Sequence, residues 1–181
     1  GSLSIIADAC ADVGVHVSCA YGVTDRNGPD GAERGLAEND RFLAASGDGY
    51  VGLHAAFTCS DDTIAAAAEL ASKHGVGVHV HVAEGPVDVD AASRLAPYTT
   101  DDWLLIHGVH LADDHGLRGT IVHNPRSNMN NSVGDARPAL VVGAHDGPGR
   151  VLRVGAREHE VAHLGIGLPF FHARNVDRRE L

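Results

Sequence analysis

The segment from Val76 to Glu84 constrains the fold of this chain more than any other. It reads Val-Gly-Val-His-Val-His-Val-Ala-Glu, an alternation of small apolar residues with two histidines that ends in a carboxylate. Its period of two predicts a β-strand that presents the valines on one face and His79 and His81, two potential metal ligands, on the other. Glu84 then lies where the strand gives way to a loop, within reach of His81. This pattern favours a functional site, although two histidines on a half-exposed strand could also produce it.

Predicted helices and strands alternate along the rest of the chain. Helix periodicity, capping residues and glycine stops separate short apolar runs. We expect strands at 15–21, 50–57, 76–84, 103–109, 119–123 and 140–144, and helices at about 2–13, 32–45, 60–75 and 87–95. This order predicts an α/β fold built from parallel strands with helical crossovers. The connections after 103–109 are short, so we expect very short helices or irregular loops there.

Polar residues of chemical interest follow strand after strand, at the carboxyl end of each. In a parallel α/β barrel this edge is where active sites are built, so five successive units are expected to contribute to one site. Taken singly, each residue has a plainer interpretation as a turn former, a core histidine or a surface carboxylate. The residues are His54, His81 with Glu84, His107, His123 with Asn124, and Asp146.

Charge and cysteine content restrict the partners and the compartment. The net charge of -10 disfavours nucleic acids and anionic membranes, so the expected partner is a small-molecule substrate. The 3 cysteines contain no Cys-x-x-Cys pair, which argues against a disulfide framework and a zinc knuckle. No apolar run approaches the ~20 residues of a membrane span, and no signal peptide opens the chain. We therefore expect a cytoplasmic protein, with homo-oligomerisation left open.

Four motifs follow one another along the chain: His81-Val-Ala-Glu84, Ile106-His107-Gly-Val-His110-Leu, Val122-His123-Asn-Pro-Arg-Ser-Asn128-Met-Asn-Asn and Gly143-Ala-His-Asp146-Gly-Pro-Gly. Together they resemble the zinc-dependent deaminase and chlorohydrolase branch of the amidohydrolase superfamily. The resemblance extends from about residue 4 to residue 149. It implies a metal-dependent hydrolase with a TIM (β/α)8 barrel, of which the strands here would be about the third to the eighth.

The resemblance also implies a role for each site residue. His81 and Asp146 would bind zinc or another divalent transition metal, which lowers the pKa of its bound water towards ~7. Asp146 would also take a proton from that water, Glu84 would pass a proton to a ring nitrogen, and His107 would orient the nucleophile or stabilise developing charge. The implied reaction is hydrolytic deamination of an aminoheterocycle or amidine, in which the bond that is hydrolysed is a C–N bond other than a peptide bond. His54 and Asn128 fall where substrate is expected.

Three departures from the family pattern limit this interpretation. The first-strand His-x-His pair, which supplies two further metal ligands, would lie before Gly1. The helix expected between His110 and Thr120 is reduced to a short polar stretch, and Ala-His-Asp replaces Gly-Thr-Asp at Asp146. We therefore expect a partial barrel over 1–149, followed by a tail at 150–181 with a short helix or two.

Two alternatives remain open at this level. The chain is either a segment of a larger aminohydrolase or a non-catalytic, truncated barrel that keeps the motifs by descent. Dehalogenation is a further possibility on the same scaffold. Because only His81 and Asp146 are expected as ligands, residues 1–181 alone should bind metal weakly and catalyse nothing.

Overall fold

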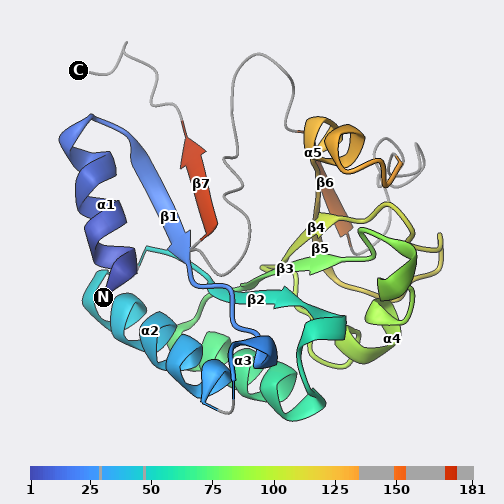
Figure 1. Cartoon of the computed structure of the whole chain (residues 1–181), viewed down its shortest axis with the longest axis horizontal. Helices are drawn as coiled ribbons and strands as arrows, with labels where there is room; N and C mark the ends of the chain where they lie inside the picture. The colour runs from blue at the N-terminus through green and yellow to red at the C-terminus, as the bar shows by residue number, and fades with distance from the viewer. Residues whose placement is uncertain (29, 47, 135–148, 154–169, 175–181) are drawn as a thin grey trace.

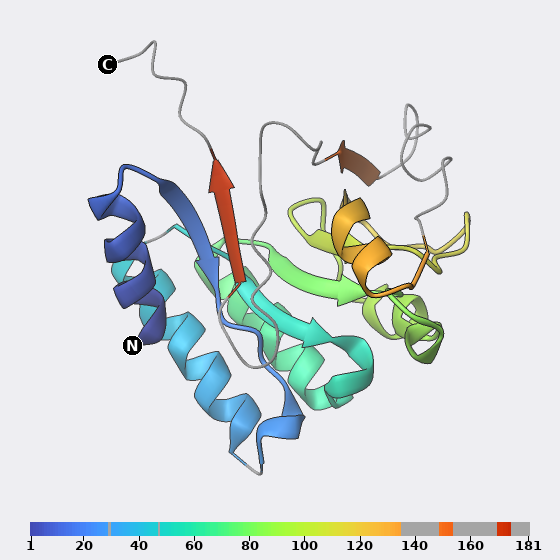
Figure 2. The ribbon, with the colours of Figure 1, turned by 45° about the horizontal axis from the view of Figure 1, so that its top comes forward.

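The computed structural model describes residues 1–28, 30–46, 48–134, 149–153 and 170–174. Five strands form one parallel sheet in the order β2-β3-β4-β5-β6, and two more form a separate antiparallel pair, β1-β7 (Figure 1). The carboxyl ends of β2 and β3 point to the side on which α4 and α5 lie (Figure 2). The strands are β1 His16–Ala20, β2 Val51–Ala55, β3 Val78–Val82, β4 Leu104–His107, β5 Gly119–His123, β6 Gly149–Arg153 and β7 Phe170–Arg174.

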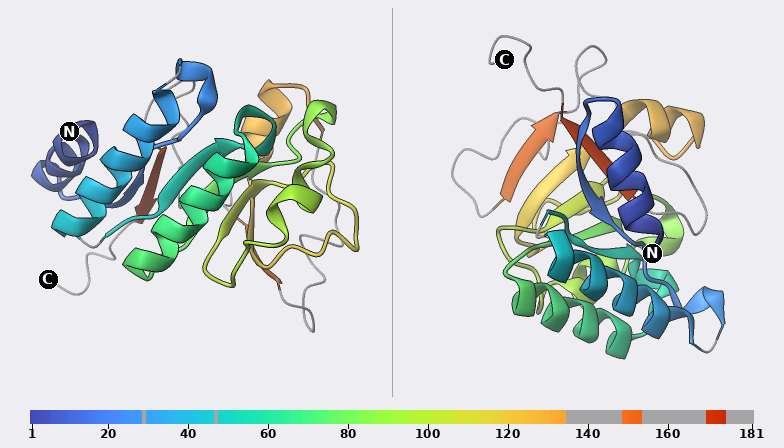
Figure 3. Two further views of the ribbon diagram at one scale, coloured as in Figure 1. Left: turned by 90° about the horizontal axis from the view of Figure 1, so that it is seen from below. Right: turned by 90° about the vertical axis from the view of Figure 1, so that its left-hand side faces the viewer.

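The helices lie largely where the sequence predicts them. α2 and α3 run side by side along one face of the sheet (Figure 3), and α1 packs on β1. α3 begins after Ser60, whose Oγ accepts a hydrogen bond from the Thr63 amide at 3.2 Å, and it ends at Gly75, whose φ is 66°. The helices are α1 Ser2–Asp12, α2 Gly31–Ser46, α3 Asp61–His74, α4 Ala91–Leu95 and α5 Pro125–Asn130, with 3-10 turns η1 Asp25–Asn27, η2 Ala56–Thr58 and η3 Pro86–Asp88. Within the described residues, no helix is long and apolar enough to cross a membrane.

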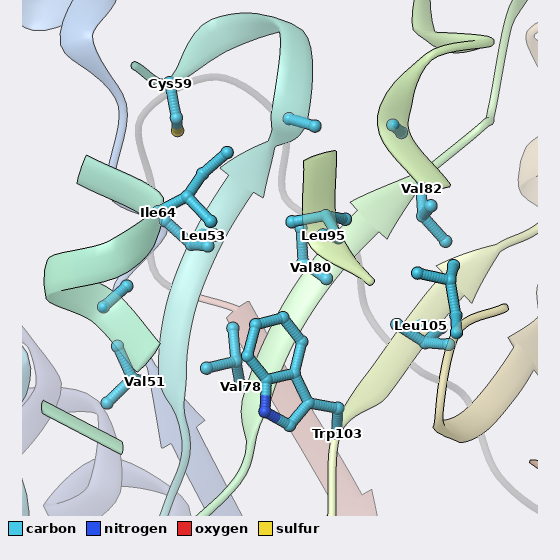
Figure 4. Packing of buried hydrophobic residues seen from close by; sticks show 14 of the residues in the cluster. Val51, Leu53, Cys59, Ile64, Val78, Val80, Val82, Leu95, Trp103 and Leu105 are labelled. Atoms are coloured by element: carbon cyan, nitrogen blue, oxygen red, sulfur yellow. The ribbon is translucent and has the colours of Figure 1, made fainter. Parts of the chain in front are cut away.

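The valines of β3 form the centre of the hydrophobic core. Val78, Val80 and Val82 are fully buried and belong to the cluster of buried apolar side chains drawn in Figure 4. The opposite face of the strand is also buried, with His79 1% and His81 9% exposed. Burial on both faces is the rule for strands of parallel sheets and barrels, so the two histidines lie inside the molecule.

β1 is joined to the main sheet by its continuation past Ala20. The Val23 amide donates to the Gly52 carbonyl, and the His54 amide donates to the Val23 carbonyl, so this segment runs parallel to β2. A Cβ at position 52 would lie 2.3 Å from the Tyr21 carbonyl oxygen, which explains the glycine there. The succession of neighbouring parallel strands predicted from the sequence therefore begins with the segment that starts at residue 16 and continues to β5.

The structure differs from several of the predictions made from the sequence. The predicted helix over 87–95 divides into η3 and α4, and α5 was not predicted, although Pro125 at its first position is a common helix start. The helix expected in the tail is wrong for the residues described, because β6 pairs with β5 and β7 pairs with β1 and both use open strand edges. The strand predicted at 140–144 and Asp146 lie outside the described residues. The domain boundary at 149 stays a prediction.

Candidate active site

Three imidazoles from successive strands meet at the carboxyl edge of the sheet. The ring centroids of His54 and His81 are 5.6 Å apart, and those of His81 and His107 are 5.2 Å apart. β2, β3 and β4 supply one ring each. The structure thus brings together three of the strand-end histidines that the sequence assigned to one site, His54, His81 and His107.

Glu84 extends towards this group from the loop after β3. Its Oε2 lies 3.6 Å from His107 Nε2, and its Oε1 accepts a hydrogen bond of 3.0 Å from Asn131 Nδ2. The carboxylate side chain is 31% exposed, whereas His107 is almost fully buried. Glu84 can therefore reach both solvent and the buried imidazole, as a group that moves protons must.

His107 is held in an unusual backbone conformation at the end of β4. Its φ of 76° lies in the left-handed region that side chains other than glycine rarely adopt. The next amide, of Gly108, donates to the Val82 carbonyl at 3.0 Å and ties this turn to β3. Burial lowers the pKa of His107, although the Glu84 carboxylate and the Asn128 hydrogen bond act in the opposite direction. This environment favours the neutral imidazole.

Asn128 supports His107 from α5, the short helix that follows His123 and Asn124 at the end of β5. Its Oδ1 accepts a hydrogen bond of 2.7 Å from His107 Nδ1. The side chain is fully buried, and its Nδ2 finds no acceptor among the described residues. Because an unused buried donor is costly, this amide is well suited to receive a ligand. The sequence placed Asn128 near substrate but gave no sign of its contact with His107.

His54 lies at the edge of the group and is only partly buried. Burial lowers its pKa, and the Arg26 guanidinium lowers it further, while the Glu84 carboxylate acts in the opposite direction. Arg26 itself lies over the ring of Phe57, 4.8 Å from its centroid. His54 is therefore expected to be neutral near pH 7 and open to a ligand.

Asp88 belongs to the site region, although the sequence did not indicate it. Its carboxylate is buried and accepts hydrogen bonds from the Ala83 amide at 2.8 Å and the Phe57 amide at 3.3 Å. Ala83 has a φ of 47°, so Asp88 stabilises a strained peptide immediately before Glu84. An aspartate two residues after a Gly-Pro pair is usually a surface turn residue, and only the fold reveals its burial.

The Asp88 carboxyl should make folding stability depend on pH. Burial raises its pKa from 3.8 to about 6, against the opposing effect of the two amide hydrogen bonds and Arg94. The native state therefore holds this proton more tightly than the unfolded state does. The resulting contribution to the free energy of unfolding is lost as pH rises through 6, and it amounts to about 3 kcal/mol at most. In Asp88→Asn this dependence should be absent. Urea unfolding of the wild type and the variant between pH 4 and pH 7 measures the free energy of unfolding of each. The same pH dependence in both proteins would contradict the assignment.

The chemistry of the donors fits a zinc ion, but the described residues do not complete a site for one. His81 supplies an imidazole nitrogen at the strand end, a donor that zinc prefers. Asp146, the other predicted ligand, lies outside the described residues, and among those described no three His, Cys, Asp or Glu side chains are grouped closely enough to hold a metal ion. His79 lies beside His81, at a ring-centroid distance of 5.9 Å.

Comparison with known sequences gives matches along most of the chain. The profile of the amidohydrolase family matches residues 2–160. A 5'-deoxyadenosine deaminase from Methanopyrus kandleri is 32% identical over 149 residues, which cover 70% of this chain and 35% of the relative. The chain thus spans about a third of the length of this curated relative.

Solved structures share the fold. A guanine deaminase from C. acetobutylicum with bound guanine superposes with a TM-score of 0.58 at 17% identity, covering 75% of this chain and 38% of that one. The atrazine chlorohydrolase TrzN from Arthrobacter aurescens TC1, complexed with zinc, gives 0.54 at 18% identity, covering 80% and 40%. The neighbours are TIM-barrel amidohydrolases, and the expected partial (β/α)8 barrel is confirmed.

Proposed function

Because this chain belongs to the amidohydrolase family, we propose that it carries part of the active site of a zinc-dependent aminohydrolase. The proposed reaction is the hydrolytic release of ammonia from an amino-substituted heterocycle, with an aminopurine as the preferred class. The observation that carries the proposal is the convergence of His54, His81 and His107 with Glu84 at the carboxyl edge of the sheet. The named deaminases among the similar proteins support the substrate class.

The metal would be held by His81 and, beyond the described residues, by Asp146. When bound, zinc lowers the pKa of a coordinated water towards ~7, which makes a nucleophile available at neutral pH. Asp146 would accept a proton from the attacking water. The nitrogen of His81 and the oxygen of Asp146 form a donor set that suits zinc.

Glu84 would move a proton between the attacking water and a ring nitrogen of the substrate. Protonation of that nitrogen makes the neighbouring carbon accept attack. The amino nitrogen would then take the proton that Asp146 accepted from the water, so that ammonia leaves as the C–N bond breaks. The hydrogen bond from Asn131 orients one carboxylate oxygen and leaves the other facing His107. This arrangement supports the shuttle role because the carboxylate is fixed yet partly open to solvent.

His107 and Asn128 would act as one unit. The neutral imidazole of His107 donates its Nδ1 proton to Asn128, so its Nε2 can accept a hydrogen bond from the attacking water and orient it. The unused amide N–H of Asn128 can donate to an acceptor on the substrate. His54, which lies on the other side of His81 from His107, would contact the heterocycle.

An assay of ammonia release tests the proposal. The product of the full reading frame, loaded with zinc, is offered 5'-deoxyadenosine, adenosine and guanine, and ammonia is followed by a coupled enzyme reaction. We expect at least one aminopurine to react with a kcat/KM of ~10⁴ M⁻¹s⁻¹ or more. Removing zinc with a chelator should stop the reaction.

The same assay separates the competing functions. The chlorohydrolase among the structural neighbours makes hydrolytic dehalogenation the second candidate, so 6-chloropurine riboside is included and chloride is measured. Chloride release without ammonia release from any aminopurine would favour that candidate. A folded, zinc-loaded protein that releases neither product would favour the non-catalytic barrel.

A further inference from the structure

The side chain of Thr58 contacts His54 in a way that restricts the position of the imidazole proton. Thr58 Oγ1 lies 3.0 Å from His54 Nδ1. The same hydroxyl donates a hydrogen bond of 2.9 Å to the carbonyl of Ala55. Thr58 is 5% exposed, so water does not compete strongly for these groups.

Counting protons decides which atom donates. A threonine hydroxyl has one proton, and a carbonyl oxygen can only accept, so that proton is used by Ala55. The contact with His54 must then be donated by the ring, which places a proton on Nδ1. The opposite assignment would set two oxygen lone pairs against each other at 2.9 Å. Cys59 Sγ, at 3.7 Å from the hydroxyl, is a weaker partner and lies 3.4 Å from the Val23 carbonyl, to which its thiol can donate.

The rest of the loop keeps Thr58 in this position. Thr24 Oγ1 donates to the Thr58 carbonyl at 3.1 Å and accepts a hydrogen bond from the Arg26 amide at 3.3 Å. Thr58 is the last residue of η2, the turn that directly follows β2. The backbone of Thr58 is therefore held by Thr24 from the neighbouring strand unit, while its hydroxyl is held by the Ala55 carbonyl at the end of β2.

We propose that Thr58 is a positioning residue that holds His54 as the neutral Nδ1–H tautomer, so that Nε2 is presented as a hydrogen-bond acceptor. This inference rests on the proposed function only in treating His54 as a ligand contact. It narrows the substrate class, because the group that meets His54 must then be a donor, such as a ring N–H, an amino group or a hydroxyl. A bare ring nitrogen at that position would meet a lone pair and be disfavoured.

The tautomer can be measured directly by long-range ¹H–¹⁵N NMR of the full-reading-frame product labelled with ¹⁵N-histidine. At pH 8 the imidazole is neutral, and the His54 signals are identified by their loss in His54→Gln. We expect the wild-type ring to show a protonated Nδ1 and an unprotonated Nε2. A protonated Nε2 in the wild type would overturn the proposal.

A pair of Thr58 variants separates positioning from a merely structural role. Thr58→Ser keeps the hydroxyl and should keep the Nδ1–H pattern, whereas the isosteric Thr58→Val should lose it in favour of a mixture or the Nε2–H form. Unchanged signals from the other histidines show that each variant is folded. An unaltered Nδ1–H pattern in Thr58→Val would contradict the proposal. The wild-type spectrum decides the question if that variant does not fold, and none of these readouts depends on turnover, so they stand apart from the deaminase assay.

Discussion

Replacing Glu84 with glutamine should lower the kcat of the full-reading-frame product by ~10² to 10⁴ while leaving its zinc content unchanged. The amide keeps the size of the side chain and can still pair with Asn131, but it cannot carry a proton to the substrate. In the wild type, Glu84 Oε2 lies 3.6 Å from His107 Nε2, so the substitution removes a carboxylate within the site. Steady-state kinetics and metal analysis by mass spectrometry on the same samples measure both quantities.

Glu69→Gln is the matched control for this experiment. Glu69 lies exposed on α3, on the outer side of the sheet, and the change removes the same charge at a distance from the site. Its kcat should stay within a factor of about two of the wild type, as expected for surface substitutions. Loss of zinc in Glu84→Gln would mean that Glu84 is a ligand and that its proposed role is wrong.

Replacing His81 with alanine should remove both zinc and turnover. Groups that only support a ligand change metal affinity by ~10- to 100-fold, so losing a direct ligand should weaken zinc binding by more than this. His81 is buried between His54 and His107, at ring-centroid distances of 5.6 Å and 5.2 Å. Zinc titration with a competing chelator gives the affinity, and ammonia release gives the activity.

His110→Ala controls for the loss of a histidine near the site. His110 is exposed, three residues beyond His107, and its backbone amide, which the substitution preserves, donates to the Ala83 carbonyl. Zinc affinity and kcat should be unchanged in this variant. Stoichiometric zinc in His81→Ala at the wild-type affinity would show that the metal is bound elsewhere.

Local sequence patterns were sufficient for most of the elements up to β5 and for three of the strand-end site residues. Period two in Val76–Glu84 predicts β3, and Ser60 and Gly75 delimit α3, because strand pleating and helix capping depend on neighbours along the chain. The strand ends then placed His54, His81 and His107 on one edge, since parallel strands repeat the same direction. Asp146 and the metal roles were assigned from the motifs alone and stay predictions.

The contacts that give these side chains their chemistry came only from the tertiary structure. Asn128 holds His107 across 21 residues, Asp88 joins the Phe57 and Ala83 amides, and the Thr58 hydroxyl sets the proton of His54. The pairing of β6 and β7 with open strand edges was equally unpredictable. Short-range patterns state which residue types are present, but burial, hydrogen-bond partners and left-handed backbone depend on how distant segments pack. Those conditions set the pKa and the donor or acceptor character of each site residue, and so they are decided by the fold.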